Sequence, residues 1–383
     1  MLDFSLTDEQ RALQDLARDF AQKQIAPIAL ELDRTGAYPF DLLKRAHQLG
    51  LLNLTIDAAY GGGGLGWIES SIVGEEFAAA CAGVTTAANA NELALTPLEI
   101  AATPEQKEKF IAPIAREGGL AAFCVTEPGA GSDVVSMRTR AAKKGDEYIL
   151  NGTKHFITNG NVAQMLTVFA STDPEQKHRG ISAFAVPADS RGITRRHMGD
   201  KMGHRASDTA EIVFEDAPVP VSNRIGNEGD GFKIAMETFN VTRIGVGAAG
   251  VGVARAALEA SVKFANERQQ FGSPIANFQG VQFMLAEMAM KVETARLSVR
   301  YAAWLADTKR SYAYASAIAK WYGSDVAMQV TTDAVQLHGG YGYMSEFKVE
   351  KYMRDAKLLQ IYEGTNQIQR LVVARALLKE QER

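Results

Sequence analysis

The sequence has little cysteine, and its two cysteines, Cys81 and Cys124, lie among small and apolar residues. Two isolated thiols cannot build a disulfide framework or a four-thiolate metal centre, so both are expected to be buried and reduced. The six histidines form no pair spaced by four residues and no H-E-x-x-H pattern, so no metal site is expected. No G-x-S-x-G elbow and no Walker loop occurs either, which leaves metal hydrolases and serine hydrolases without support.

Excess charge of one sign and long apolar runs are also missing. The 41 basic and 45 acidic residues give a net charge of −4, and no run of Lys and Arg offers a footprint for nucleic acid or anionic lipid. No stretch of 18 or more uncharged apolar residues occurs, and the start, MLDFSLTDEQ, lacks a signal pattern. We therefore expect a soluble intracellular protein without nucleic-acid or membrane partners. Met1 directly before the first helix favours a bacterial cytoplasmic protein, and a mitochondrial matrix location would require a processed eukaryotic form.

The length of 383 residues and 46% apolar content predict two or three globular domains. Helical patterns fill residues 1–119, short β-rich runs fill 120–229, and long helical periods return over 230–383. Thr7 and Gln10 form an expected capping box at the first helix. Further helical stretches are expected at about 39–49, 66–80, 105–116, 232–265, 278–307, 310–337 and 346–377.

The β-rich runs are separated by Gly, Pro, Asn and Asp at the spacing of an antiparallel sandwich or barrel. They cover residues 123–125, 148–150, 165–169, 181–186 and 211–214. The last helical segments predict a bundle. The predicted fold class is therefore α+β, with a helical N-terminal domain, a central β domain and a C-terminal helical bundle.

The stretch Gly245 to Gly250 fits G-x-G-x-x-G, the fingerprint of a dinucleotide-binding turn. That turn needs a preceding strand, and residues 232–242 have a helical pattern instead. We therefore expect these small residues to let two helices pack closely.

Three other segments are candidates for ligand binding or chemistry. The turn 126–133 follows an apolar strand and is rich in glycines and hydroxyls, which can leave backbone N–H groups free for a polar ligand. Residues 154–160 place Phe156 and Thr158 on one strand face. Glu363 lies between apolar and aromatic residues and a glycine, where a raised pKa would suit a general base. An ordinary turn, an ordinary strand and a surface glutamate remain the alternatives.

These motifs, in this order on an α, β, α chain, resemble the acyl-CoA dehydrogenase family of flavoproteins. The match extends from Thr7 through Tyr60, Gly61 and Gly62 and residues 267–272 to Thr365. The resemblance implies a helical N-terminal domain, a central β domain, a C-terminal four-helix bundle, one FAD per subunit and a homotetramer. It implies removal of an α-proton from a saturated acyl-CoA thioester, hydride transfer to flavin N5, and reoxidation by electron-transfer flavoprotein.

By the same resemblance, Glu363 is the catalytic base. Some branches of the family place the base directly before an arginine on the first helix of the C-terminal domain, where this chain has Thr242 before Arg243. A hydroxyl there cannot act as the base. The FAD contacts implied within one subunit are Phe123, Val125, Thr126, Gly131, Ser132, Phe156, Thr158, Thr365 and Gln367. Those implied from a neighbouring subunit are Arg268, Phe271, Gln279, Gln336, Gly339 and Gly340.

The acyl-CoA contacts implied by the resemblance begin with the channel segment 201–209. The remaining ones are Ser132, Asn240, Arg243, Tyr362, Gly364, Thr86 and Asn89, with Thr85 and Leu93 also at the pocket floor. A straight short or medium chain is expected as substrate. A branched-chain dehydrogenase, an acyl-CoA oxidase-type relative and a non-enzymatic acyl-CoA-binding homologue remain alternatives.

Overall fold

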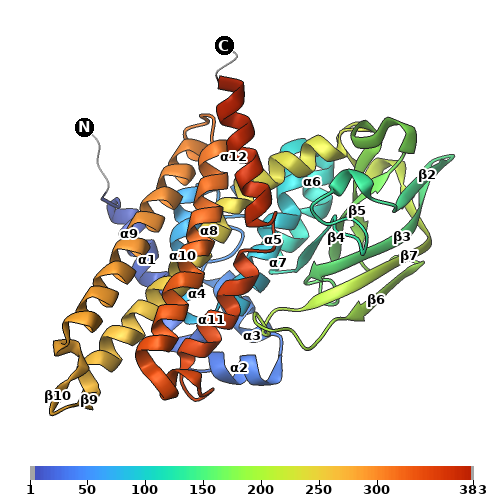
Figure 1. Ribbon diagram of the computed structural model, residues 1–383. Coiled ribbons are helices and arrows are strands. Elements are labelled where there is room, and N and C mark those ends of the chain that lie inside the picture. The colour runs from blue at the N-terminus through green and yellow to red at the C-terminus, as the bar shows by residue number, and fades with distance from the viewer. Residues whose placement is uncertain (1–4, 381–383) are drawn as a thin grey trace.

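The computed structural model describes residues 5–380 and follows the expected α, β, α order (Figure 1). The first four residues, on which part of the expectation about targeting rests, lie outside the described residues. The N-terminal helices are α1 (Asp8–Phe20), α2 (Ala29–Thr35), α3 (Phe40–Gln48), α4 (Trp67–Ala80), α5 (Ala82–Ala101), α6 (Pro104–Phe110) and α7 (Ala112–Glu117).

Local chemistry sets several of these helix boundaries. The capping box at α1 is confirmed, because Thr7 Oγ1 accepts from Gln10 N at 3.2 Å and Gln10 Oε1 accepts from Thr7 N at 3.1 Å. The single helix expected over 105–116 is instead two, α6 and α7, which meet at Ile111. Pro113 lies in the first turn of α7, where its missing N–H costs no hydrogen bond.

The central domain is one sheet with the strand order β6-β7-β3-β2-β4-β5-β8, and β1 pairs with β4. The expected fold class is confirmed, but the sheet is mixed because β1 runs parallel to β4. The bounds are β1 Ala121–Cys124, β2 Arg140–Lys144, β3 Glu147–Thr158, β4 Met165–Ser171, β5 Ile181–Pro187, β6 Ile193–His197, β7 Thr209–Pro220 and β8 Arg224–Ile225.

The C-terminal helices are α8 (Gly231–Glu267), α9 (Gln279–Asp307), α10 (Ala313–His338), α11 (Lys348–Leu359) and α12 (Asn366–Glu380). A short hairpin of β9 (Gln269–Gln270) and β10 (Ser273–Pro274) joins α8 to α9 at the end of the bundle away from the sheet (Figure 1). The segment expected to be helical over 346–377 is two helices. Glu363 and Gly364 have φ values of 49° and 87°, which an α-helix cannot continue.

The glycines of the G-x-G-x-x-G stretch lie inside α8, so the helix-packing interpretation is confirmed. A Cβ added to Gly247 would lie 2.9 Å from Ala319 O, and one added to Gly250 would lie 2.6 Å from Gly323 O, both on α10. Among the described residues, α8 is the one helix long and apolar enough to cross a membrane by composition. Its most apolar window is 83% buried, as in the core helix of a globular fold.

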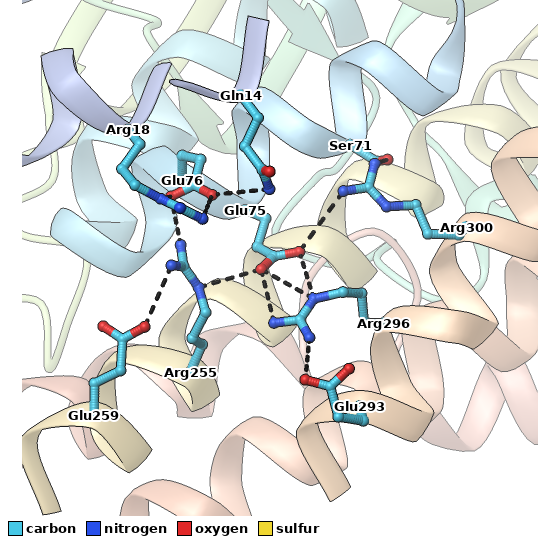
Figure 2. Close-up of polar contacts among 10 residues, drawn as sticks. All are labelled: Gln14, Arg18, Ser71, Glu75, Glu76, Arg255, Glu259, Glu293, Arg296 and Arg300. Carbon is cyan, nitrogen blue, oxygen red and sulfur yellow. Dashed lines mark hydrogen bonds and ion pairs between the residues drawn. The ribbon is translucent and has the colours of Figure 1, made fainter. Parts of the chain in front are cut away.

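A buried ion network ties the two helical domains together (Figure 2). Glu75 and Glu76 of α4 are 4% and 2% exposed. Glu75 Oε1 pairs with Arg255 Nε of α8 at 3.2 Å and with Arg296 Nη2 of α9 at 3.0 Å. Glu76 pairs with Arg255 at 2.6 Å and with Arg18 of α1 at 2.8 Å. The network joins α1 and α4 to the bundle, so the first domain packs in a fixed position on the last.

Both cysteines are buried and free, as expected.

Candidate active site

Glu363 stands on a left-handed turn between α11 and α12. A left-handed residue other than glycine costs about 1–2 kcal/mol, so contacts around it must hold the turn. Arg243 Nε donates to Glu363 O at 3.1 Å, Gln369 Nε2 donates to Gly364 O at 3.1 Å, and Lys320 Nζ donates to Gly364 O at 2.8 Å. The backbone around the carboxylate is therefore fixed from three helices, α8, α10 and α12.

The carboxylate of Glu363 receives a hydrogen bond from Thr242 Oγ1 to Oε2 at 2.8 Å. Burial raises the pKa of Glu363, while Thr242, Arg243 and Lys320 oppose part of that rise. A partly buried carboxyl with a raised pKa is suited to proton abstraction near neutral pH. The alternative of a surface glutamate at a helix end is wrong, because the side chain faces α8.

Thr242 has a role that the sequence did not predict. Its position before Arg243 excluded it as a base, but in the fold its hydroxyl supports the glutamate 121 residues further along the chain. No local pattern at Thr242 indicates such a contact, because it depends on how α8 packs against the turn.

Aromatic contacts connect the turn at Glu363 to strand β1. The Phe123 ring lies 5.4 Å from the ring of Phe239 on α8, and the Arg243 guanidinium lies 5.6 Å from the same Phe239 ring. Asn240 Oδ1 accepts from Arg243 Nη1 at 3.3 Å. The structure thus brings the predicted residues Phe123, Asn240, Arg243 and Glu363 together, and Phe239 is the connecting residue that the sequence did not single out.

The turn 126–133 is anchored by a buried ion pair. Lys154 Nζ lies 2.8 Å from Glu127 Oε1 and 3.1 Å from Val125 O, and the lysine is fully buried. The same carboxylate accepts from Arg138 N at 2.6 Å and from Thr139 N at 3.0 Å. Three donors on one carboxylate make this more than an ordinary turn.

The outer side of this turn is open. A Cβ added to Gly129 or Gly131 would meet nothing within 4 Å, and Phe156 on the neighbouring strand β3 is 64% exposed. Ser132 is exposed, and Thr126 and Thr158 are partly exposed. A flavin requires an open surface with an aromatic ring beside it and hydroxyls that can hydrogen-bond to it. The open side at Gly129 and Gly131, the exposed Phe156 ring and the nearby hydroxyls provide these, so the residues fit FAD.

Several residues predicted to line the acyl pocket are linked by polar contacts beside Glu363. Thr86 Oγ1 lies 2.8 Å from His204 Nδ1, and His204 Nε2 lies 2.9 Å from Asp355 O. The Tyr362 ring meets the His204 ring edge-on with centroids 6.0 Å apart. Asn89 faces α8, since a Cβ on Gly245 would lie 3.6 Å from Asn89 Nδ2.

The other two predicted pocket-floor residues, Thr85 and Leu93, make their contacts elsewhere. Thr85 Oγ1 donates to Cys81 O of its own chain segment at 3.1 Å, and Leu93 packs beside the core that contains Phe123.

A second group of predicted cofactor residues lies elsewhere in the chain. A cavity of about 560 Å³ is lined by Arg268, Gly339 and Gly340 together with Phe264, His338 and Tyr341. The Arg268 guanidinium lies 5.2 Å from the Tyr341 ring. All residues that line this cavity belong to the C-terminal domain, at the β9–β10 end of the bundle (Figure 1). Within a single chain, therefore, Arg268 lies apart from Phe123 and the other cofactor residues predicted at the sheet.

The remaining predicted residues are also placed. Phe271, in the β9–β10 hairpin, is 96% exposed, and Gln279 and Gln336 are exposed on α9 and α10. Thr365 Oγ1 accepts from Ile368 N at 3.3 Å at the start of α12, and Gln367 is exposed on that helix.

Comparison with known proteins places this chain in a family. Residues 7–118 match the acyl-CoA dehydrogenase N-terminal domain, 122–217 the middle domain and 229–378 the C-terminal domain. The chain therefore belongs to the acyl-CoA dehydrogenase family of FAD-binding oxidoreductases.

Three relatives show how close this membership is. Cyclohex-1-ene-1-carbonyl-CoA dehydrogenase of Geobacter metallireducens is 46% identical over 376 residues, 97% of this chain and 99% of the relative. Butyryl-CoA dehydrogenase from Megasphaera elsdenii has a TM-score of 0.96 and 43% identity, covering 98% of this chain and 100% of that one. A chain in the structure of the electron transferring flavoprotein of Acidaminococcus fermentans has a TM-score of 0.97 and 46% identity, covering 98% and 100%.

Proposed function

We propose that this chain dehydrogenates a straight short- or medium-chain acyl-CoA to the trans-2-enoyl-CoA, with Glu363 as the base that removes the α-proton. The observation that carries the proposal is the Glu363 carboxyl group, which lies on a turn held by Arg243 and has a raised pKa. Through Arg243 and Phe239 it is connected to Phe123 of β1. FAD, when bound, accepts the β-hydrogen as a hydride.

The hydrogen bonds of the carboxylate indicate which oxygen takes the proton. Thr242 donates to Oε2. Among the described residues no hydrogen bond is made to Oε1, so Oε1 is the atom open to substrate. The Thr242 bond also restrains the carboxylate, because a donor prefers to lie along a lone-pair direction of the oxygen that it contacts.

The separation of the two predicted cofactor groups supports an assembly in which FAD contacts two copies of the chain. Arg268 and Gly339 line a cavity at the β9–β10 end of the bundle, away from the sheet (Figure 1), whereas Phe123 belongs to strand β1 of that sheet and Gly131 to the turn after it. The exposed apolar side chains along α9 would be covered by such a contact: Phe283, Met290, Leu297 and Tyr301 are 50–60% exposed. A homotetramer, measured by light scattering, is the expected assembly.

The choice of substrate has two candidates. Similarity to butyryl-CoA dehydrogenase favours a short straight chain, whereas similarity to cyclohex-1-ene-1-carbonyl-CoA dehydrogenase favours an acyl group carrying a ring at the α-carbon. Electron-transfer flavoprotein is proposed as acceptor, since the A. fermentans structure includes such a flavoprotein. Rapid peroxide formation in air would indicate an oxidase instead.

The test is the anaerobic visible spectrum of the FAD-loaded protein after addition of straight, branched and cyclic acyl-CoAs of graded length. We expect one subset to bleach the oxidised flavin band. Glu363→Gln should retain FAD and lose bleaching, whereas Glu346→Gln, an exposed glutamate before α11, should behave as wild type. Bleaching by Glu363→Gln would refute the role of the glutamate.

A further inference from the structure

Lys320 is a fully buried lysine on α10, directly behind the base turn. Its Nζ donates to Gly364 O at 2.8 Å and to Asn366 Oδ1 at 2.9 Å. Buried lysines are ordinarily paired with a carboxylate. Within residues 5–380 no carboxylate lies within ion-pair distance of Nζ, so both of its hydrogen-bond partners are neutral oxygen atoms of the turn and its helix.

The position of the ammonium group is fixed by its neighbours. Asn366 Nδ2 donates to Asp325 Oδ1 at 2.7 Å and to Ser324 Oγ at 2.9 Å, which turns the amide oxygen of Asn366 toward Lys320. Gln360 Nε2 donates to the same Asp325 Oδ1 at 2.7 Å. Both ends of the segment 360–366 are therefore bound to α10, and Lys320 holds its middle at the Gly364 carbonyl.

Lys320 also acts on the glutamate through its charge. Burial and the Arg243 charge lower the pKa of Lys320 to about 7, while Glu363 and Asp325 oppose that fall. In return, Lys320 and Arg243 lower the pKa of Glu363 against the effect of burial. These are the charged groups that face the pair from α8, from α10 and from the turn.

We propose that Lys320 is a positioning residue for the base: it fixes the Gly364 carbonyl of the left-handed turn, and its charge keeps the Glu363 carboxylate ionised to lower pH. This inference rests on the proposed role of Glu363. Lys320 lies behind the turn and acts on the reaction through the turn residues Glu363 and Gly364.

The experiment compares Lys320→Gln and Lys320→Met with the wild-type holoenzyme over a range of pH. One readout is the rate of anaerobic flavin bleaching by butyryl-CoA, or by the best acyl-CoA of the graded series. The other, independent of turnover, is the infrared band of the protonated Glu363 carboxyl, identified as the band missing in Glu363→Gln.

Both variants should move the midpoint of the rate profile and of the infrared band upward by about one pH unit, because removal of a nearby cation raises the pKa of a carboxyl. Bleaching below the midpoint should then be about tenfold slower. Lys320→Met should also lower the rate at high pH, since it loses the bond to Gly364, whereas Gln keeps a donor. Lys348→Gln is the matched control: Lys348 also donates to a backbone carbonyl, Ala26 O at 3.2 Å, and should leave both midpoints in place.

Unchanged midpoints in Lys320→Gln and Lys320→Met would overturn the proposal and leave the lysine a purely structural role. If the neutral variants fail to fold, Lys320→Arg is the deciding variant, because it keeps the positive charge and should keep the wild-type midpoint. An upward shift of the midpoint by about one pH unit in Lys320→Arg would contradict the proposal. Failure of the proposed function is a separate outcome, and flavin bleaching in Glu363→Gln would reveal it.

Discussion

Replacing Thr242 by valine removes one hydroxyl while keeping the shape of the side chain. The lost interaction is the 2.8 Å hydrogen bond from Thr242 Oγ1 to Glu363 Oε2. A hydrogen bond to a charged group contributes about 1.5–3 kcal/mol. Because about 1.4 kcal/mol corresponds to one pKa unit, the loss should raise the pKa of Glu363 by about one to two units.

The sign follows from which form of the carboxyl the bond stabilises. The hydroxyl donates to the ionised form, so valine favours the protonated form, and the rate of flavin bleaching should begin to rise only at higher pH. Below that midpoint the variant should bleach about tenfold to hundredfold more slowly. At high pH, where the base is ionised in both proteins, the rates should converge.

The assay is stopped-flow flavin bleaching under anaerobic conditions across pH, with a matched control on the same helix. Thr238, one turn earlier on α8, is fully buried, and its Oγ1 has no hydrogen-bond partner among the described residues. Thr238→Val should therefore leave the profile unchanged, and Thr242→Ser should keep most of it. If Thr242→Val shows the wild-type midpoint, the hydroxyl does not stabilise the ionised base and the reasoning is refuted.

Three further substitutions test the scaffold. Gly250→Ala should lower stability by about 1–3 kcal/mol in thermal unfolding, because its Cβ would lie 2.6 Å from the Gly323 carbonyl, whereas Gly74→Ala, with 3.9 Å to its nearest neighbour, should not. Lys154→Met leaves Glu127 buried without its cation and should release the turn, so the flavin-to-protein absorbance ratio should fall; full FAD content would contradict this. Glu75→Gln removes one carboxylate from Arg255 and Arg296, which keep Glu76 and Glu293, and should cost about 1.5–3 kcal/mol for the weakened charged hydrogen bonds; an unchanged unfolding midpoint would show that Glu75 is dispensable.

The order of the domains could be predicted from the sequence because it depends on local information. Helical periods, β-rich runs and turn residues recur within a few positions, and the glycines of α8 were assigned correctly because the preceding residues are helical. The parallel pairing of β1 with β4 could not be predicted in this way, since it joins segments about 40 residues apart with two strands between them.

The chemistry of Glu363 depends on contacts that no local pattern records. Burial raises the pKa of Glu363, and Thr242 and Arg243, 121 and 120 residues earlier, and Lys320 oppose that rise. Arg243 and Lys320 also hold its left-handed turn through backbone carbonyls. A carboxyl beside a glycine break is a local feature, so the sequence could single out Glu363 as a candidate, and the family resemblance then favoured it as the base. The groups that shift the pKa of its carboxyl lie on helices that meet only in the folded chain. Variants at Thr242 and Lys320 should therefore change the pH at which the protein works before they change what it works on.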